Sequence, residues 1–433
     1  MNFYSTKKNT EPVSFKQALL TGMPQDEGLY MPESIPDLSK IFNQETHLSF
    51  QEISYLISSK FIDKELSENE LHNIIESCIA FDAPNRCVYD DIYCLELFHG
   101  PTLAFKDYGA RFMARCMESF IRSFDKEINI LVATSGDTGS AVAHGFYDVE
   151  GVNVVILYPK DKVSYIQEQQ LTTFDKNIYA LEVDGSFDDC QRLVKNAFLD
   201  PSLQGKINLS SANSINIARL IPQSFYYMHS YMQLKDKSIP TVCSVPCGNF
   251  GNITAGLIAK KMGVPIDQFI ASTNLNDVVP KYFETGNYDP KPSIQTISNA
   301  MDVGNPSNMA RIMNMYANIN DLKNDMVSWS FNEQETSDMI SHIEDKYNYL
   351  IDPHSSVGIL GLLKYINMQN TKMNNIFLGT AHPGKFADVI EPVINKEVEL
   401  PDRLKKILKK EKHSIPLKND FEEFNDFLLR TFQ

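Results

Sequence analysis

Two strand–loop–helix segments with glycine-containing loops constrain the fold of this chain most strongly. The first begins with the apolar run Ile128–Ala133, which predicts a buried strand, and continues into residues 140–146, which predict the start of a helix. Between them lies the loop TSGDTG, residues 134–139. Small hydroxyl residues and glycines at a strand-to-helix turn leave backbone N–H groups free to bind an anion.

The second segment has the same layout with a different loop sequence. Thr241–Pro246 predicts a strand, residues 247–252 a turn, and residues 253–262 a helix. Gly248 and Gly251 permit close backbone approach to a phosphate. Each loop alone is also typical of a plain strand-to-helix turn without a ligand. The occurrence of both loops is therefore stronger evidence for an anion site than either one.

The rest of the chain alternates between strand and helix patterns. Further strand-like runs occupy residues 152–158, 178–183, 269–273 and 376–379. Helical patterns separate these runs, which predicts an α/β fold with parallel sheets covered by helices. Two such sheets meeting at a cleft would place the two loops on opposite sides of one ligand.

We expect three regions along the chain. Residues 1–80 are expected to be mostly helical, with helical runs at 50–61 and 70–79. The core is expected to span residues 81–390, with a smaller subdomain at about 107–220 and a larger one at about 221–390. Residues 391–433 are expected to form a helical extension.

One lysine stands beside an apolar residue at the start of an amphipathic helical run. Lys106 follows Phe105, and residues 108–124 place apolar side chains at helical spacing. Asp107 is expected to cap the helix. Partial burial and the positive end of a helix both favour the neutral amine, which attacks carbonyls and forms Schiff bases. Most lysines at such positions are solvated, so the prediction that Lys106 is a reactive amine depends on the two loops.

Charge and cysteine content exclude several other function classes. The 433 residues carry a formal net charge of −15, which disfavours binding to nucleic acid or an anionic membrane. An anionic substrate would then need local positive groups. Seven cysteines without framework spacing predict reduced thiols in a cytoplasmic protein, and no metal site is expected. No signal segment or membrane span is expected, and both a monomer and a homodimer remain open.

Longer stretches resemble the threonine synthase family, enzymes of fold type II that use pyridoxal 5'-phosphate. The matching segments are HGPTLAFKDYGARFMA, ATSGDTGSAVAHGFY, SSANSINIARL, VPCGNFGNITAGLIAK, SNAMDVGNPSN and FLGTAHPGKF, with GLYMP near the N-terminus. They run in family order and cover nearly the whole chain. The resemblance implies a fold like that of the tryptophan synthase β chain, with two open, twisted, mostly parallel sheets flanked by helices and a helical N-terminal domain.

The resemblance implies a set of cofactor residues. Lys106 would bind pyridoxal 5'-phosphate as a Schiff base and then shuttle protons. The main-chain N–H groups of one loop would hold the cofactor phosphate, namely those of Gly248, Asn249, Phe250, Gly251 and Asn252. Cys247 replaces the serine expected in relatives, which puts a side-chain hydroxyl contact in doubt. Thr380 would hydrogen-bond the pyridine nitrogen, although strand-end threonines are also common without a ligand.

The resemblance also implies substrate residues. The substrate carboxylate would be held by Thr134, Ser135, Gly136, Asp137 and Thr138. Because a carboxylate repels an anion, Asp137 would act structurally or near the cofactor's 3'-oxygen. The substrate phosphate would be bound by Asn213, Ser214 and Arg219, since arginine matches phosphate geometrically. The alternative for Arg219 is a surface salt bridge. His99, His144 and His382 lie inside matched segments and receive no catalytic role.

The implied reaction, the last step of threonine biosynthesis, converts O-phospho-L-homoserine and water to L-threonine and phosphate. Lys106 would move protons at the α- and β-carbons, phosphate would leave the γ-carbon, and water would add at the β-carbon. One rival is a related lyase, either a dehydratase or a phospholyase that forms 2-oxobutyrate. The other is a catalytically silent cofactor-binding protein. The phosphate residues argue against a dehydratase but not a phospholyase, and the intact Lys106 and loops argue against a silent protein.

Overall fold

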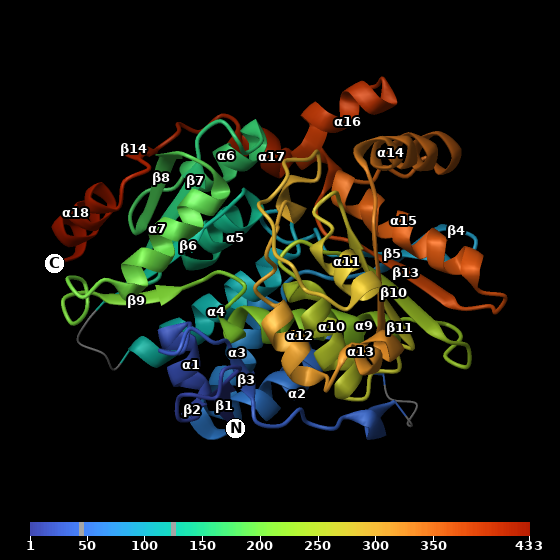
Figure 1. Cartoon of the computed structure of the whole chain (residues 1–433), viewed down its shortest axis with the longest axis horizontal. Helices are drawn as coiled ribbons and strands as arrows, with labels where there is room; N and C mark the ends of the chain where they lie inside the picture. The colour runs from blue at the N-terminus through green and yellow to red at the C-terminus, as the bar shows by residue number, and fades with distance from the viewer. Residues whose placement is uncertain (43–46, 123–126) are drawn as a thin grey trace.

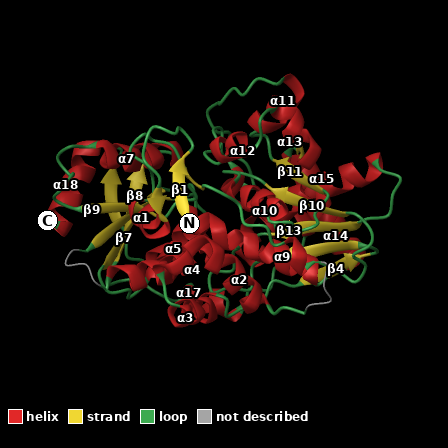
Figure 2. Cartoon of the chain, turned by 90° about the horizontal axis from the view of Figure 1, so that it is seen from below, coloured by secondary structure: helices red, strands yellow, loops and turns green. Residues whose placement is uncertain are grey.

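Two sheets, each at the centre of one lobe, organise the chain (Figure 1). The computed structural model describes residues 1–42, 47–122 and 127–433. Figure 2, seen from below, shows the same two lobes with helix α4 (Lys106–Ile121) near their junction. The prediction of an α/β fold with two sheets is therefore confirmed.

The larger sheet has six strands and is almost entirely parallel. From edge to edge they are β12 (Met326–Ser330), β11 (Gln268–Thr273), β10 (Thr241–Pro246), β13 (Asn374–Gly379), β5 (Ile92–Glu96) and β4 (Asn85–Tyr89). Only the edge strand β4 pairs antiparallel with its neighbour. Every residue of β10 and β13 is buried, as expected for central parallel strands covered on both faces.

The smaller sheet has five strands that are all parallel. In order they are β14 (Ile415–Lys418), β8 (Ile178–Asp184), β7 (Val152–Pro159), β6 (Ile128–Ala133) and β9 (Asn208–Ser211). Successive side chains of β6 alternate between two cores: Ile130 and Val132 face the central core, whereas Leu131 packs with Leu193 on the other side. Edge strand β14 comes from the C-terminal region, which was expected to be helical, so that expectation was incomplete.

Helices cover both sheets. In chain order, those after the N-terminal region and α4 are α5 (Asp137–Phe146), α6 (Tyr165–Thr172), α7 (Phe187–Leu199), α8 (Ile217–Leu220), α9 (Phe225–Met232), α10 (Gly251–Lys261), α11 (Val278–Thr285), α12 (Met309–Met315), α13 (Ile319–Asp325), α14 (Glu333–Tyr347), α15 (Pro353–Met368), α16 (Ala387–Ile394), α17 (Asp402–Ile407) and α18 (Phe421–Phe432). Helix α15 packs against β10, β11 and β13, and α18 packs against α7. Within the described ranges, no helix is long and apolar enough to cross a membrane.

The N-terminal region combines helices with a small antiparallel sheet. Its strands are β1 (Asn2–Ser5), β2 (Val13–Ser14) and β3 (Tyr30–Pro32), and its helices are α1 (Phe15–Thr21), α2 (Phe50–Ile62) and α3 (Glu68–Cys78). The predicted helices α2 and α3 are present, and capping boxes at Ser49 and Ser67 begin them. The prediction missed the sheet. Helices α1 and α3 pack against α4, so this region supports the helix that carries Lys106.

Helix α4 starts earlier than predicted. Lys106 is its first residue and Phe105 its N-cap, so the expectation that Asp107 caps the helix is wrong. The Asp107 carboxylate instead accepts hydrogen bonds from the Thr102 N–H at 2.9 Å and the Thr102 hydroxyl at 2.7 Å. These bonds fix the turn before the helix and place Lys106 at its positive end. Phe124, part of the expected helical run, lies outside the described residues.

The two predicted loops are shorter than expected, because their helices begin sooner. Helix α5 begins at Asp137 and α10 at Gly251. The backbone before each helix has positive φ, with 132° at Gly136 and 58° at Phe250. Both loops follow the carboxyl ends of parallel strands, one in each sheet, and both reach the same pocket.

Candidate active site

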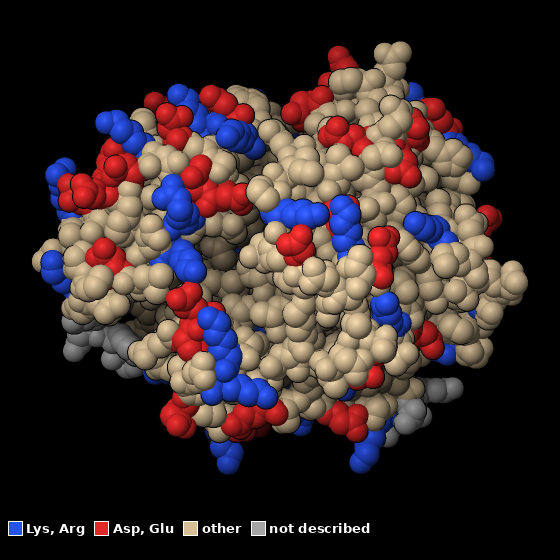
Figure 3. Space-filling view, in the orientation of Figure 1, with Lys and Arg blue, Asp and Glu red and all other residues tan. Residues whose placement is uncertain are grey.

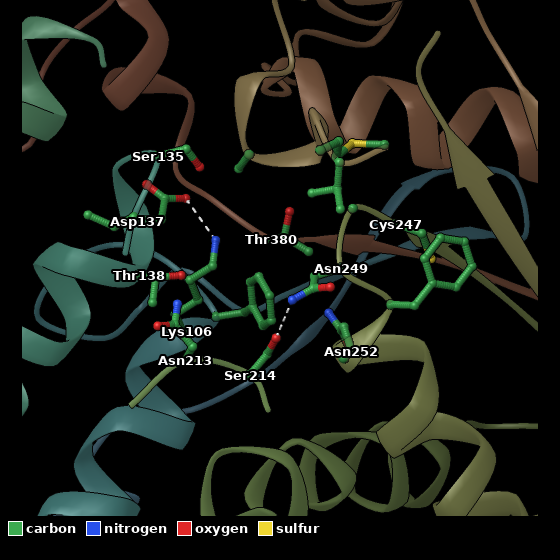
Figure 4. Close-up of a pocket in the computed structure, with 18 of the residues that line it drawn as sticks. Lys106, Ser135, Asp137, Thr138, Asn213, Ser214, Cys247, Asn249, Asn252 and Thr380 are labelled. Carbon is green, nitrogen blue, oxygen red and sulfur yellow. Dashed lines mark hydrogen bonds and ion pairs between the residues drawn. The ribbon is translucent and has the colours of Figure 1, made fainter. Parts of the chain in front are cut away.

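A solvent-open pocket of about 970 Å³ lies between the lobes (Figure 4). Figure 3 shows a hollow between the lobes on one face of the molecule. Of the predicted site residues, all except Gly136 line this pocket: Lys106, Thr134, Ser135, Asp137, Thr138, Asn213, Ser214, Arg219, Gly248, Asn249, Phe250, Gly251, Asn252 and Thr380. Residues from five separate stretches of sequence therefore meet at one place.

Lys106 points into the pocket from the start of α4. Its Nζ lies 3.8 Å from Asp137 Oδ2 and 5.0 Å from the centre of the Phe105 ring (Figure 4). Burial lowers the pKa of Lys106; the Asp137 carboxylate opposes this shift, while the cations of Lys385 and Arg219 add to it. The net direction is downward, so the neutral amine is more accessible than in a solvated lysine.

Asp137 is a buried carboxylate with partners already in place. Its Oδ1 lies 2.7 Å from Lys385 Nζ and accepts a hydrogen bond from Gln167 Nε2 at 2.9 Å. Burial opposes its ionisation, but the cations of Lys385 and Lys106 outweigh burial and lower the pKa of Asp137 well below its ordinary value. Asp137 therefore stays ionised. Sequence reasoning missed Lys385 and Gln167; the only signal for Lys385 was its place in FLGTAHPGKF.

In the 134–139 loop, the Thr134 side chain fixes the backbone conformation, and Ser135 and Thr138 face the pocket. The Thr134 hydroxyl accepts hydrogen bonds from the N–H groups of Gly136 at 3.0 Å and Gly139 at 2.8 Å. Ser135 and Thr138 line the pocket beside the start of α5 (Figure 4). Their hydroxyls and the first N–H groups of α5 can receive an anion.

The loop before α10 forms a cradle for an anion. Among the described residues, no protein acceptor receives a hydrogen bond from the N–H groups of residues 248–252. Phe250 has left-handed backbone (φ 58°), which turns successive N–H groups toward the pocket. A Cβ at Gly248 would come within 2.7 Å of the Ala300 oxygen, so only glycine fits there. These features fit the phosphate of pyridoxal phosphate.

Asn252 adds a side-chain donor to this cradle. Its Oδ1 accepts hydrogen bonds from the hydroxyls of Tyr226 at 2.6 Å and Tyr227 at 2.7 Å. Its Nδ2 is buried at the pocket and has no partner among the described residues. An unpaired buried donor is costly, so it suits a ligand acceptor. Sequence reasoning missed both tyrosines, because they lie in an apolar helix with no polar motif.

Ser214 joins the cradle to the opposite wall. Its Oγ accepts hydrogen bonds from Asn249 Nδ2 at 2.7 Å and Asn308 Nδ2 at 3.3 Å (Figure 4). With two donors already bound, its own proton remains available to a ligand. Neighbouring Asn213 exchanges hydrogen bonds with the Ala133 N–H at 3.2 Å and the Ala133 carbonyl at 2.7 Å, so its amide mainly fixes the end of β6.

Arg219 is a buried cation with no ion-pair partner among the described residues. It is 2% exposed, and no carboxylate within the described part of the chain forms an ion pair with it. Burial lowers its pKa to about 10, with Asp107 opposing the shift, so it stays charged at neutral pH. Its Nη1 donates to the Ala212 carbonyl. The alternative of a surface salt bridge is therefore wrong, and Arg219 gives the pocket positive charge against the net charge of −15.

Thr380 lies at the end of β13, where its carbonyl accepts the Phe105 N–H at 2.9 Å. This bond ties the strand end to the turn that carries Lys106. Cys247 donates its Sγ–H to the Val245 carbonyl at 3.2 Å, so the thiol faces the protein rather than a ligand. His354, which the sequence reasoning missed, also lines the pocket, and its Nε2 accepts the Ala300 N–H at 3.2 Å.

The three histidines that received no catalytic role lie outside the lining of this pocket. His99 Nε2 lies 2.8 Å from Glu96 Oε2. His382 accepts the Gly384 N–H at 3.0 Å and so caps the short helix η5 (Pro383–Phe386). Burial lowers the pKa of His144 and of His382 to about 4, which leaves both neutral at pH 7.

Family models match almost the whole chain. A model described as "Pyridoxal-phosphate dependent enzyme" matches residues 79–378. "Threonine synthase N terminus" matches residues 2–79, and "Threonine synthase, C-terminal" matches residues 355–428. The first of these models alone covers more than half of the chain.

Individual relatives agree with these models. The threonine synthase of Haemophilus influenzae is 44% identical over 432 residues, covering 100% of both chains. That of Escherichia coli is 42% identical over 407 residues, covering 93% of this chain and 94% of its own.

Solved structures extend the likeness to three dimensions. The Escherichia coli threonine synthase structure has a TM-score of 0.93 at 39% identity, covering 99% of this chain and all of its own. The pyridoxal-phosphate-bound threonine synthase of Brucella melitensis has a TM-score of 0.91 at 30% identity and covers both chains completely. Together with the two strand–loop–helix segments around the partly buried Lys106, these matches establish that the chain belongs to the threonine synthase family of pyridoxal-phosphate-dependent enzymes.

Proposed function

We propose that this chain converts O-phospho-L-homoserine and water to L-threonine and phosphate. The observation that carries the proposal is the buried cation of Arg219, which lies in the same pocket as Lys106 and forms no ion pair with any described carboxylate. A substrate that carries a phosphate explains why a charge is kept there without a partner, since burying an unpaired charge is costly. A dehydratase substrate has no phosphate and would leave this charge without a role.

Lys106 is the residue that attaches the cofactor and moves protons at the substrate's α- and β-carbons. Its lowered pKa favours the neutral amine that both tasks require. Pyridoxal phosphate, when bound, supplies an electron-withdrawing ring that stabilises negative charge on the carbon beside the substrate nitrogen. The protein contributes position, charge and proton transfer.

The cofactor phosphate is held by the N–H groups of residues 248–252 and by Asn252 Nδ2. Support comes from the absence of acceptors for these donors among the described residues. Thr380, at the end of β13, would hydrogen-bond the ring nitrogen. A neutral hydroxyl at this position would not force the ring nitrogen to stay protonated, in contrast to a carboxylate partner.

The substrate's two anionic ends are bound on different walls of the pocket. The carboxylate binds at the start of α5, to the hydroxyls of Ser135 and Thr138 and to free N–H groups. The phosphate binds to Arg219 and Ser214, with Asn213 holding the adjacent strand end. Phosphate departure thus takes place beside a fixed cation, which stabilises the charge that develops on the leaving group.

We also propose that residues 1–80, 81–390 and 391–433 act as three regions, with subdomains at about 107–220 and 221–390. The division is supported by the two separate sheets and by the packing of β14 and α18 on the smaller one. A cytoplasmic location is supported by seven cysteines that form no disulfide. A small-molecule partner rather than nucleic acid is supported by the formal net charge of −15, and on the face in Figure 3 acidic and basic side chains are interspersed. The chain acts as a monomer or as a homodimer.

The test is a product assay with purified protein, pyridoxal phosphate and O-phospho-L-homoserine. The proposal predicts threonine and phosphate in equal amounts, with 2-oxobutyrate as a minor product at most. Phosphate accompanied by 2-oxobutyrate and ammonia would identify a phospholyase. No phosphate release would identify a silent protein, and Lys106→Ala provides the baseline.

A further inference from the structure

A second lysine, Lys385, is completely buried behind the pocket. It lies on η5, the short helix that follows strand β13 of the larger sheet. Its Nζ is 2.7 Å from Asp137 Oδ1 at the start of α5. The same ammonium donates to the Thr102 carbonyl at 3.0 Å. A buried ammonium is tolerated only when it is paired and hydrogen-bonded, and Lys385 meets both conditions.

Lys385 and Lys106 share one carboxylate unequally. Asp137 Oδ1 is 2.7 Å from Lys385, whereas Asp137 Oδ2 is 3.8 Å from Lys106. If Lys106 were the only partner of Asp137, loss of its charge would strand a buried carboxylate. Because Lys385 lies closer to Asp137, the carboxylate keeps a cationic partner when Lys106 loses its charge.

The backbone turn before α4 connects the two lysines. The Thr102 carbonyl accepts hydrogen bonds from Lys385 Nζ and from Gln170 Nε2 at 3.0 Å each, while the Thr102 N–H and hydroxyl bind Asp107. This turn leads directly into Lys106. Lys385 is therefore fixed to the same turn that positions the Lys106 amine.

We propose that Lys385 is a positioning residue that acts as the permanent counter-ion of Asp137 and so leaves Lys106 free to lose its proton. The inference deepens the proposed role of Lys106 and rests on it. Lys385 does not itself line the pocket, so it acts through Asp137, which does.

The charged groups around the pair determine the sign of its effect. Lys106 faces Asp137 on α5, Lys385 on η5 and Arg219 on α8, and Lys385 also interacts with Asp107 on α4. His382 lies on the loop before η5 and is neutral at pH 7, because burial lowers its pKa to about 4. His354 on α15 and Cys247, which follows β10, are further titratable groups that line the pocket.

Removing Lys385 has two effects on Lys106, and both act in the same direction. It removes a repelling cation, and it leaves the Asp137 carboxylate to Lys106 alone. The pKa of Lys106 therefore rises. Removing the Asp137 carboxylate does the opposite, because an attracting anion is lost and two repelling cations remain.

The test measures the Lys106 amine in the full chain freed of cofactor. Reductive methylation with formaldehyde and cyanoborohydride is followed over pH, and mass spectrometry quantifies the Lys106 peptide. In Lys385→Met the midpoint should move up by at least about one pH unit, which is about tenfold less neutral amine at a given pH below it. In Asp137→Asn the midpoint should move down, and in the double variant it should fall between the two.

Lys412→Met is the matched control. Lys412 pairs with Glu168 at 2.7 Å and Glu182 at 3.3 Å, away from the pocket, so its loss should leave the Lys106 midpoint unchanged. A midpoint in Lys385→Met that is unchanged or lower would overturn the proposal. So would an unchanged or higher midpoint in Asp137→Asn.

Wild-type protein gives a second measurement if Lys385→Met does not fold. Lys385 should be methylated at least about tenfold more slowly than Lys106, because its Nζ is completely buried and bound by Asp137 and the Thr102 carbonyl. Equal rates would overturn the proposal. Methylation reports on the amines whether or not Lys106 serves catalysis, so failure here is distinct from failure of the product assay.

Discussion

Replacing Arg219 with leucine separates substrate binding from both folding and cofactor binding. The arginine is buried at the pocket, has no carboxylate partner among the described residues, and makes one hydrogen bond to the Ala212 carbonyl. Leucine preserves apolar bulk but removes the cation. If Arg219 binds the substrate phosphate, the substitution should lower kcat/KM and leave folding and cofactor binding unchanged.

The magnitude follows from the burial of the contact. Losing a buried charge-assisted contact costs about 2–5 kcal/mol. This corresponds to a fall in kcat/KM of about thirtyfold to several thousandfold. The free energy of unfolding of the cofactor-free protein should be unchanged or higher, because removal of an unpaired buried charge offsets the lost hydrogen bond.

Steady-state kinetics with O-phospho-L-homoserine, a titration with pyridoxal phosphate and a denaturant melt together check this prediction. Arg115→Leu is the control, since Arg115 is partly exposed and pairs with Glu118 on the surface of α4 at 2.7 Å. It should keep full activity. A near-normal kcat/KM for Arg219→Leu would show that Arg219 is structural, and loss of cofactor binding would place it in the cofactor site instead.

Three further substitutions test the cradle and the helix start. Gly248→Ala should weaken cofactor affinity at least about tenfold in a fluorescence titration, because its Cβ meets backbone at 2.7 Å, whereas Gly286→Ala, with open space around it, should not. Tyr226→Phe removes one of two donors that orient Asn252 and should weaken cofactor affinity by about 1 kcal/mol, about fivefold. Burial raises the pKa of Asp107 to about 6, above its unfolded value, so the proton favours the folded state. Relative to Asp107→Asn, wild type should lose about 2 kcal/mol of stability between pH 4 and pH 6 in denaturant melts, and an equal pH dependence would contradict this.

The sequence predicted the central strands well and the helix starts poorly. Ile128–Ala133 was predicted to the residue, because six consecutive buried positions leave a continuous apolar run. Strand β9 reads Asn-Leu-Ser-Ser and was missed, since its pairing with β6 comes from the fold rather than from propensity. Helices α5 and α10 begin with polar or glycine residues, which local propensity assigns to loops.

The same limit applies to the pocket. Residues within recognisable motifs, such as Lys106 and Asp137, could be identified because the motif carries its own chemistry. Lys385 also lies in a matched segment, but its role could not be identified there, because that role depends on a contact with Asp137 that only the folded chain creates. Tyr226 is a similar case: its hydroxyl matters through Asn252, and nothing in the local sequence indicates that pairing.

We propose that Lys106 carries the cofactor, although a second lysine, Lys385, also lies within reach of Asp137. Borohydride reduction of the loaded wild-type protein, followed by digestion and mass spectrometry, tests it directly. We expect the added mass of the reduced cofactor on the peptide that contains Lys106 and on no other peptide. The Lys106→Ala variant should show no added mass. Attachment at Lys385, or an equally labelled Lys106→Ala, would contradict it.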